Sequence, residues 1–164
     1  MADRTDTFYA GEAIHGYGAQ LMVGDGASPE TFEAVAQLLS ITPGEMTTAV
    51  IDKTHLRSPE AHREKLAGLR DSGPFTLTGT WAPHEQSQSN AGGGSGAFAS
   101  GGLMFLWRTR AERNMKIVLP TDPEIEWPFR GVVTKFQPGE IGVDDKINFT
   151  AEITPLQDFS ADLP

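Results

Sequence analysis

Strict alternation of apolar and polar side chains is the feature that most constrains the fold of this chain. Successive side chains of a β-strand point to opposite faces, so a period of two predicts a strand with one buried face. The pattern is clearest over residues 146–153 and 75–81, and it returns at 115–119, while residues 129–136, FRGVVTKF, supply another strand. Strands therefore outnumber helices, and we expect a mainly β fold.

The first third of the chain predicts a short strand and then a hairpin. Residues 19–23, AQLMV, are apolar except for Gln20 and end at the turn signal Gly24-Asp25-Gly26. Residues 32–41 are apolar at nearly every position, and Pro43 and Gly44 follow where a type II turn places Pro and Gly. We therefore expect residues 41–56, ITPGEMTTAVIDKTHL, to form a strand, a turn at Pro43-Gly44 and a second strand.

Two segments indicate helices. Ser58, Pro59 and Glu60 provide an N-cap, a proline at the first helical position and an acidic side chain near the positive helix end, which predicts a short surface helix over 59–70. Residues 98–107 are too continuously apolar for a half-exposed strand and predict a buried helix.

The ends of the chain and one internal segment are polar enough to lie outside the core. Residues 1–17 and 156–164 carry isolated apolar side chains without a period, which indicates N- and C-terminal arms. A polar stretch beginning near Asp52 indicates a protruding loop over about 54–72. With 164 residues, the chain is expected to form one domain with its core in residues 18–155.

Composition excludes several classes of function. The chain has no cysteine, which removes disulfides, thiolate metal sites and cysteine catalysis. Its net charge of −9 disfavours a surface that grips nucleic acid, because such binding relies on Lys and Arg. No apolar run approaches the length of a membrane span, and the first residues lack a signal-peptide core, so we expect a soluble protein without membrane contact.

Motifs that would indicate an enzyme all fail on context. The glycines at 92 and 94 follow a polar segment rather than a strand, so they do not predict a dinucleotide site. His84 lies four residues before Gln88, where a zinc-binding motif needs a second histidine. Ser95 and Ser100 do not complete a nucleophile motif. We therefore expect no enzyme, with no catalytic residue, cofactor or metal.

Arg108, Arg110, Arg113 and Lys116 form the only basic run. The acidic balance of the chain and the lack of interleaved aromatic residues argue against nucleic-acid contact there. We expect these side chains to pair with acidic neighbours, within one subunit or across a subunit boundary.

Four segments taken together carry a resemblance to a known family. They are LLSITPGEMTTAVIDKTHL, GPFTLTGTWAPHEQSQ, NMKIVLPTD and FRGVVTKFQPGEIGVDDKINFTAEITP. In this order and spacing, from about residue 18 to residue 155, the chain resembles the major tail tube proteins of long, non-contractile-tailed bacteriophages of the lambda type.

The resemblance implies a β-sandwich or split barrel with one flanking helix at about 97–108, joined into hexameric rings that stack into a tube. It implies that residues 34–40 and 47–53 belong to strands that continue a sheet between subunits around the lumen. It also implies that the 54–72 loop and both arms reach neighbouring subunits. The candidate contact residues are Phe8, Tyr9, Tyr17, His55, Leu56, Arg57, Leu66, Leu69, Leu156 and Phe159.

An acidic tube lumen would repel DNA phosphates over the Debye length of about 8–10 Å, so that DNA slides without sticking. The candidate lumen residues are Glu33, Glu45, Asp52 and Glu152, each on or next to an expected strand. The implied partners are further copies of the chain, the tape-measure, tail terminator and baseplate or tip proteins, and DNA in transit. The implied location is the virion tail, assembled in the bacterial cytoplasm.

Two alternatives stay open. The inner tube of a contractile secretion system would share the fold and would be accompanied by a sheath gene. A β-barrel that binds a small molecule would need convergent polar groups in a pocket, and the sequence offers none.

Overall fold

In the computed structural model, nine strands and one short α-helix account for the regular structure of residues 13–14, 16–57, 62–92, 96–143 and 145–157, which are the residues described. The mainly β fold with a single flanking helix, as expected from the sequence, is confirmed. None of the helices in this described part is long and apolar enough to cross a membrane.

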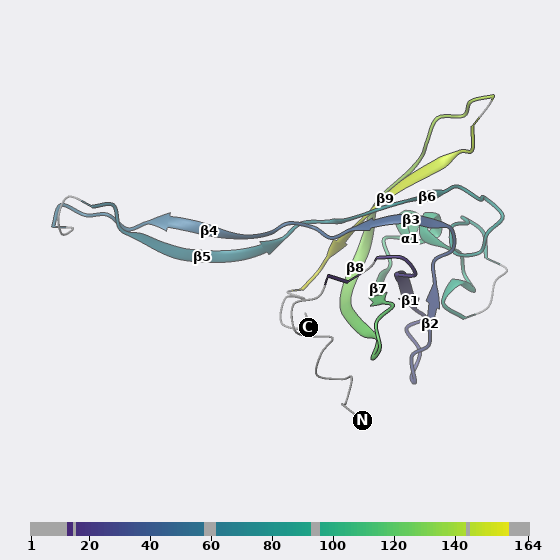
Figure 1. The fold of residues 1–164 in the computed structure, drawn as a ribbon, viewed down its shortest axis with the longest axis horizontal. Helices are drawn as coiled ribbons and strands as arrows, with labels where there is room; N and C mark the ends of the chain where they lie inside the picture. The colour runs from purple at the N-terminus through teal and green to yellow at the C-terminus, as the bar shows by residue number, and fades with distance from the viewer. Residues whose placement is uncertain (1–12, 15, 58–61, 93–95, 144, 158–164) are drawn as a thin grey trace.

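Seven strands form one antiparallel sheet (Figure 1). Along the sheet the order is β2-β1-β7-β8-β9-β6-β3. The strands are β1 (Gln20–Gly24), β2 (Phe32–Ala34), β3 (Leu38–Thr42), β6 (Phe75–Thr80), β7 (Glu112–Leu119), β8 (Ile125–Pro138) and β9 (Asn148–Pro155). The four stretches with clean alternation or strand composition are β6, β7, β8 and β9, so these sequence predictions are confirmed.

The sheet curls into a split barrel because its two edge strands are joined by a very short connection. Only residues 35–37 separate β2 from β3, and a connection of this length can span about 15 Å at most. In a flat sheet of seven strands, the two edge strands would lie about 29 Å apart. Val35 N–H still donates to Leu21 in β1, and Gln37 C=O accepts from Thr80 in β6. The connection therefore crosses from one edge of the sheet to the other. The apolar run 32–41 accordingly forms two short strands with this crossing between them.

Two buried polar side chains hold the crossing in place. Ser87 Oγ accepts a hydrogen bond from Ala36 N–H at 3.0 Å. The Gln88 amide donates to the carbonyl groups of Ala36 and Thr80, each at 3.1 Å, and accepts from Ala82 N–H at 2.8 Å. Gln88, which occupies the position where a zinc-binding motif would need histidine, therefore serves to hold the backbone of the crossing in place.

The core fills the inside of the curl. The apolar residues of the alternating strands point inward, and Phe75 stacks on Phe129 with ring centroids 4.4 Å apart. The helix α1 (Leu103–Thr109), preceded by a 3-10 turn (Gly96–Phe98), packs against β8 and contributes buried Leu103 and Leu106. The apolar run 98–107 thus divides into a turn and a shorter helix, because Gly101 and Gly102 lie between them. Gly101 has φ +135°, a conformation that a side chain disfavours.

The remaining two strands leave the barrel as a long hairpin. β4 (Met46–Asp52) pairs with β5 (Lys65–Ser72), and the hairpin projects well beyond the body of the protein (Figure 1). Two sequence predictions are wrong here. Pro43-Gly44 is not a hairpin turn, since β3 pairs with β6 and the chain runs on into β4. Residues 65–70 are not helical, because pairing with β4 overrides the local helix signals; residues 58–61 lie outside the described residues.

Candidate assembly surfaces

The β4–β5 hairpin exposes apolar side chains that the rest of the subunit does not cover. Every residue of β4 is exposed. Val50 is 64% and Leu69 86% exposed, and Ile51 and Leu66, which face each other across the hairpin, are both more than half exposed. A two-stranded hairpin that stands alone in water is only marginally stable. The hairpin is therefore a candidate surface for contact with another protein.

At its base, the hairpin is joined to the barrel through two glycines. Gly73 N–H donates to the carbonyl of Glu45 at 2.8 Å, and a Cβ on Gly44 would overlap the backbone of Gly73. The close approach explains why glycine stands at position 44, whereas a Cβ on Gly73 would meet its nearest atom only at 3.2 Å. Pro43-Gly44 therefore marks the point at which the β4–β5 hairpin leaves the barrel, and it is not the turn of a hairpin.

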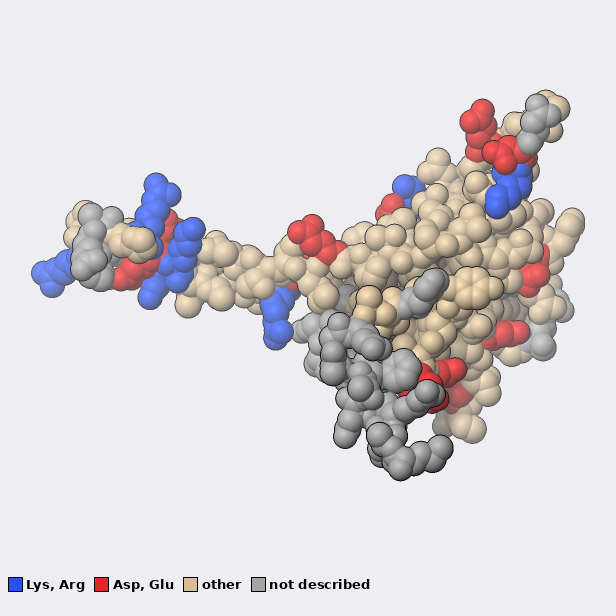
Figure 2. Space-filling model, viewed as in Figure 1, with Lys and Arg blue, Asp and Glu red and all other residues tan. Residues whose placement is uncertain are grey.

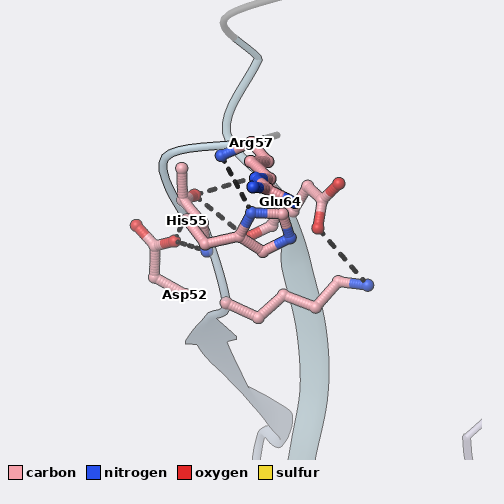
Figure 3. A network of polar contacts seen from close by, with 6 residues as sticks. Asp52, His55, Arg57 and Glu64 are labelled. Carbon is pink, nitrogen blue, oxygen red and sulfur yellow. Dashed lines mark hydrogen bonds and ion pairs between the residues drawn. The ribbon is translucent and has the colours of Figure 1, made fainter. Parts of the chain in front are cut away.

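The tip of the hairpin is ordered by local polar contacts (Figure 3). Asp52 accepts hydrogen bonds from the hydroxyl and the backbone N–H of Thr54, and these bonds lower the pKa of the Asp52 carboxyl. Arg57 N–H donates to His55 Nδ1 at 3.1 Å, and Lys53 lies 3.7 Å from Glu64 across the hairpin. Leu56, at 107% relative exposure, stands out from this framework. The tip thus presents an apolar side chain beside cationic ones.

A second uncovered surface follows the edge strand β3. A cavity of about 470 Å³ lies between β3 and the open side of the barrel. Its lining is largely apolar and includes Tyr17, Leu39, Ile41, Leu119 and Trp127. Because β3 is the last strand of its sheet, its outer backbone groups face away from the sheet. The split of the barrel is therefore an apolar groove beside an edge strand.

The expected contact residues lie on several of these surfaces. His55, Leu56 and Arg57 are at the hairpin tip, Leu66 and Leu69 are on β5, Tyr17 lines the groove, and Leu156, at 46% exposure, follows β9. Phe8, Tyr9 and Phe159 lie outside the described residues. The structure therefore gathers five of the ten candidates on the hairpin. Two of these five, Leu66 and Leu69, lie on β5, in residues 65–72, which the sequence assigned to a loop.

The four candidate lumen carboxylates do not form one cluster. Glu33 lies on β2, Glu45 between β3 and β4, Asp52 at the end of β4, and Glu152 on β9. Glu152 is paired with Lys135 at 3.1 Å, so part of its charge is compensated. Its neighbours on the polar face of the sheet are threonines, among them Thr78 on β6 and Thr150 on β9. This face is polar and nearly neutral.

The side chains of the basic run at residues 108–116 do not form one cluster. Lys116 forms an ion pair with Glu126 at 2.7 Å within the subunit. Arg113 donates to the carbonyl of Asp25 at 2.9 Å, and Arg108 lies over the Phe105 ring at 5.5 Å. The expected ion pairing is confirmed for Lys116 alone. Among the described residues, no group of His, Asp and Glu has the arrangement of a metal site.

Sequence reasoning missed one surface, the loop between β8 and β9. Ile141 is 74% and Val143 101% exposed at its end. This loop also stands out from the body in Figure 1. The segment GEIGVDDK reads in sequence as a polar turn, and the signal that was overlooked is the pair of aliphatic residues within it.

The family model described as "Lambda phage tail tube protein, TTP" matches residues 17–157. No curated protein sequence matches the chain.

Solved structures with the same fold come from contractile injection systems and gene transfer agents. A chain of the sheath-tube complex of an extracellular contractile injection system, PVC, in the extended state has a TM-score of 0.62 and 14% identity, with 95% of this chain and 96% of that chain covered. A chain of the native gene transfer agent virion has a TM-score of 0.59 and 14% identity, with 89% and 96% covered. A chain of the anti-feeding prophage baseplate has a TM-score of 0.60 and 13% identity, with 90% and 94% covered. At these identities the likeness shows the fold.

Proposed function

The chain belongs to the lambda phage tail tube protein family, and on this premise we propose that its copies assemble into stacked hexameric rings that form a hollow phage tail tube. It is a structural tail protein. DNA passes through the lumen of the tube during ejection. The subunits are assembled in the bacterial cytoplasm and end in the tail of the virion.

One observation carries this proposal: the β4–β5 hairpin places Val50, Ile51, Leu66 and Leu69 in water. Burying apolar surface contributes about 25 cal/mol per Å², so covering this hairpin on a neighbouring subunit stabilises the assembly. The exposed edge of β3 supports the same conclusion, since pairing it with a neighbour would remove an edge that otherwise favours uncontrolled association.

The lumen is proposed to be acidic overall. Glu33, Glu45, Asp52 and Glu152 remain the candidate carboxylates, although Lys135 partly compensates Glu152 and one carboxylate oxygen of Glu33 is buried in the subunit. The threonines on the polar face of β6 and β9 suit a surface over which DNA slides, because hydroxyl groups carry no charge to hold phosphates. The tube would meet a tape-measure protein within it, and terminator and baseplate or tip proteins at its ends.

A second candidate is the inner tube of a contractile injection system. The fold likeness to the sheath-tube complex favours it. A neighbouring gene that encodes a sheath protein would decide for this alternative, and its absence would leave the non-contractile tail.

Negative-stain electron microscopy of the purified protein at rising concentration tests the proposal. We expect tubes or stacked rings with a stain-filled lumen. A protein that stays monomeric even after incubation with a tail-initiation complex would overturn the proposal.

A further inference from the structure

The molecule carries opposite charge on two protrusions that point away from the body in different directions. The β4–β5 hairpin extends to one side of the barrel and the β8–β9 loop to another (Figure 1). Figure 2 shows most of the Lys and Arg of this face toward the far end of the hairpin, with Asp and Glu among them, and it shows Asp and Glu beside Lys or Arg on the projecting loop. These two surfaces cannot meet within one subunit.

The charges of the hairpin depart strongly from those of the rest of the chain. Residues 46–72 hold five Lys or Arg against four Asp or Glu, a net charge of +1, whereas the remaining residues hold eight against eighteen, a net charge of −10. Near the tip, Glu64 and Lys53 form an ion pair with each other, and Asp52 accepts hydrogen bonds from Thr54. Arg57 and Arg63 are exposed and make no ion pair within the described residues.

The β8–β9 loop is complementary in both charge and polarity. Residues 139–147 hold Glu140, Asp144 and Asp145 against Lys146 alone. An open hollow of about 630 Å³ is lined by Glu140, Val143, Asp145 and Lys146, among others. Outside the hairpin, Val143 and Ile141 are the most exposed aliphatic side chains of the described residues. The loop thus offers an apolar spot flanked by carboxylates, and the hairpin tip offers Leu56 flanked by cations.

We propose that the hairpin tip of one subunit docks on the β8–β9 loop of a second copy, with Leu56 against Val143 and with Arg57 and Arg63 facing Glu140 and Asp145. This inference rests on the proposed function and names the contact that links subunits of the tube. The two surfaces differ, so the interface is heterologous and propagates from copy to copy. Individual exposed ion pairs contribute little; the charges steer the tip and fix its register, while the apolar contact contributes burial.

Charge reversal on each side tests the pairing. One variant carries Arg57→Glu and Arg63→Glu, and the other carries Glu140→Lys and Asp145→Lys. Each variant alone places like charges in contact, so we expect its threshold concentration for tube formation to rise at least about tenfold. Mixing the two variants restores opposite charges wherever the two variants alternate, and it should lower the threshold back toward that of the wild type. The matched control, Asp122→Lys with Glu124→Lys on the turn before β8, should assemble normally.

The outcomes separate this inference from the proposed function. Wild-type protein that forms no tubes overturns both. Tubes from the wild type and from both reversed variants at the same threshold overturn only the inference. If each variant fails to assemble and mixing the two does not restore assembly, the inference is also overturned. The substituted residues of the tip and of the loop would then contact other surfaces, such as the groove beside β3.

Cross-linking provides a second test that does not alter charge. The chain has no native cysteine, so Leu56→Cys with Val143→Cys introduces one thiol on each surface. A short bis-maleimide added to assembled tubes should yield a ladder of covalent multimers. Tyr17→Cys with Val143→Cys is the control and should not yield one. Tubes of the Leu56→Cys/Val143→Cys variant that give no ladder would contradict the proposed pairing.

Discussion

Gly44 lies so close to Gly73 that a Cβ on Gly44 would overlap the Gly73 carbonyl group. The contact is between backbones, and the strands that lead into and out of the hairpin pass each other at this point. A side chain could fit only if the two segments moved apart. The course of the chain at the base of the projecting hairpin therefore depends on the absence of a side chain at Gly44.

We expect Gly44→Ala to lower the free energy of unfolding by at least about 1 kcal/mol, since backbone has to move to admit the methyl group. Denaturant unfolding of dilute, monomeric protein measures the change. Gly142→Ala is the control, because a Cβ there meets nothing within 4 Å, and its effect should stay within about 0.5 kcal/mol. Equal effects of the two substitutions would contradict the close approach.

Gln88→Leu removes the partners of three backbone groups near the crossing between β2 and β3. A buried group left without a hydrogen bond costs about 1–3 kcal/mol, so we expect a loss of at least about 2 kcal/mol. Gln86→Leu makes the same chemical change at an exposed position two residues away and should change the free energy of unfolding by less than about 0.5 kcal/mol. A Gln88→Leu protein as stable as the wild type would show that the crossing does not depend on this side chain.

Asp25 organises the turn after β1. The hydroxyl of Thr31 and the backbone N–H groups of Ala27 and Thr31 donate to its carboxylate, and they lower its pKa. A lowered pKa in the folded state means that the stability from Asp25 is fully present above its unfolded pKa of about 3.9 and is lost as the pH falls through the lower folded value.

We therefore expect Asp25→Asn to be less stable than the wild type near pH 6, with the difference shrinking below about pH 4. Unfolding curves at several pH values measure it. Thr31→Val, which removes the hydroxyl donor, should show part of the same pH dependence. A difference between Asp25→Asn and wild type that stays constant from pH 6 to pH 3 would refute the assignment.

Leu69 tests the role of the exposed hairpin in assembly. Leu69→Asp replaces an 86% exposed side chain, so the monomer should unfold within about 0.5 kcal/mol of the wild type. Tube formation should be strongly reduced, because the substitution places a charge in the proposed contact. Sedimentation velocity of the variant and the wild type at matched concentrations reads out assembly. Normal tubes from Leu69→Asp would remove this part of the hairpin from the interface.

The sequence predicted best where burial determines the pattern. In β6 and β9 one face is packed in the core, so Phe75, Leu77, Phe149 and Ile153 alternate with polar residues and reveal the strands. β4 and β5 are exposed on both faces, so no alternation marks β5, and the signals at Ser58-Pro59 suggested a helix instead. Only the pairing of β5 with β4, a tertiary contact, decides its structure.

The candidate surfaces could be predicted from the sequence only in part. Leu56, Leu66 and Leu69 could be placed on a projecting segment through the family resemblance, and the structure puts them on the hairpin. The roles of Ser87 and Gln88 could not be read from the sequence, because their partners are backbone groups about 50 residues away as well as nearby. The exposure of Val143 likewise depends on how far the β8–β9 loop projects.

Cryo-electron microscopy of the assembled protein tests the central claim most directly. The account predicts rings of six subunits stacked around an open, acidic lumen, with each β4–β5 hairpin buried against another copy. Solid fibres without a lumen, or rings in which the hairpins stay in solvent, would contradict it.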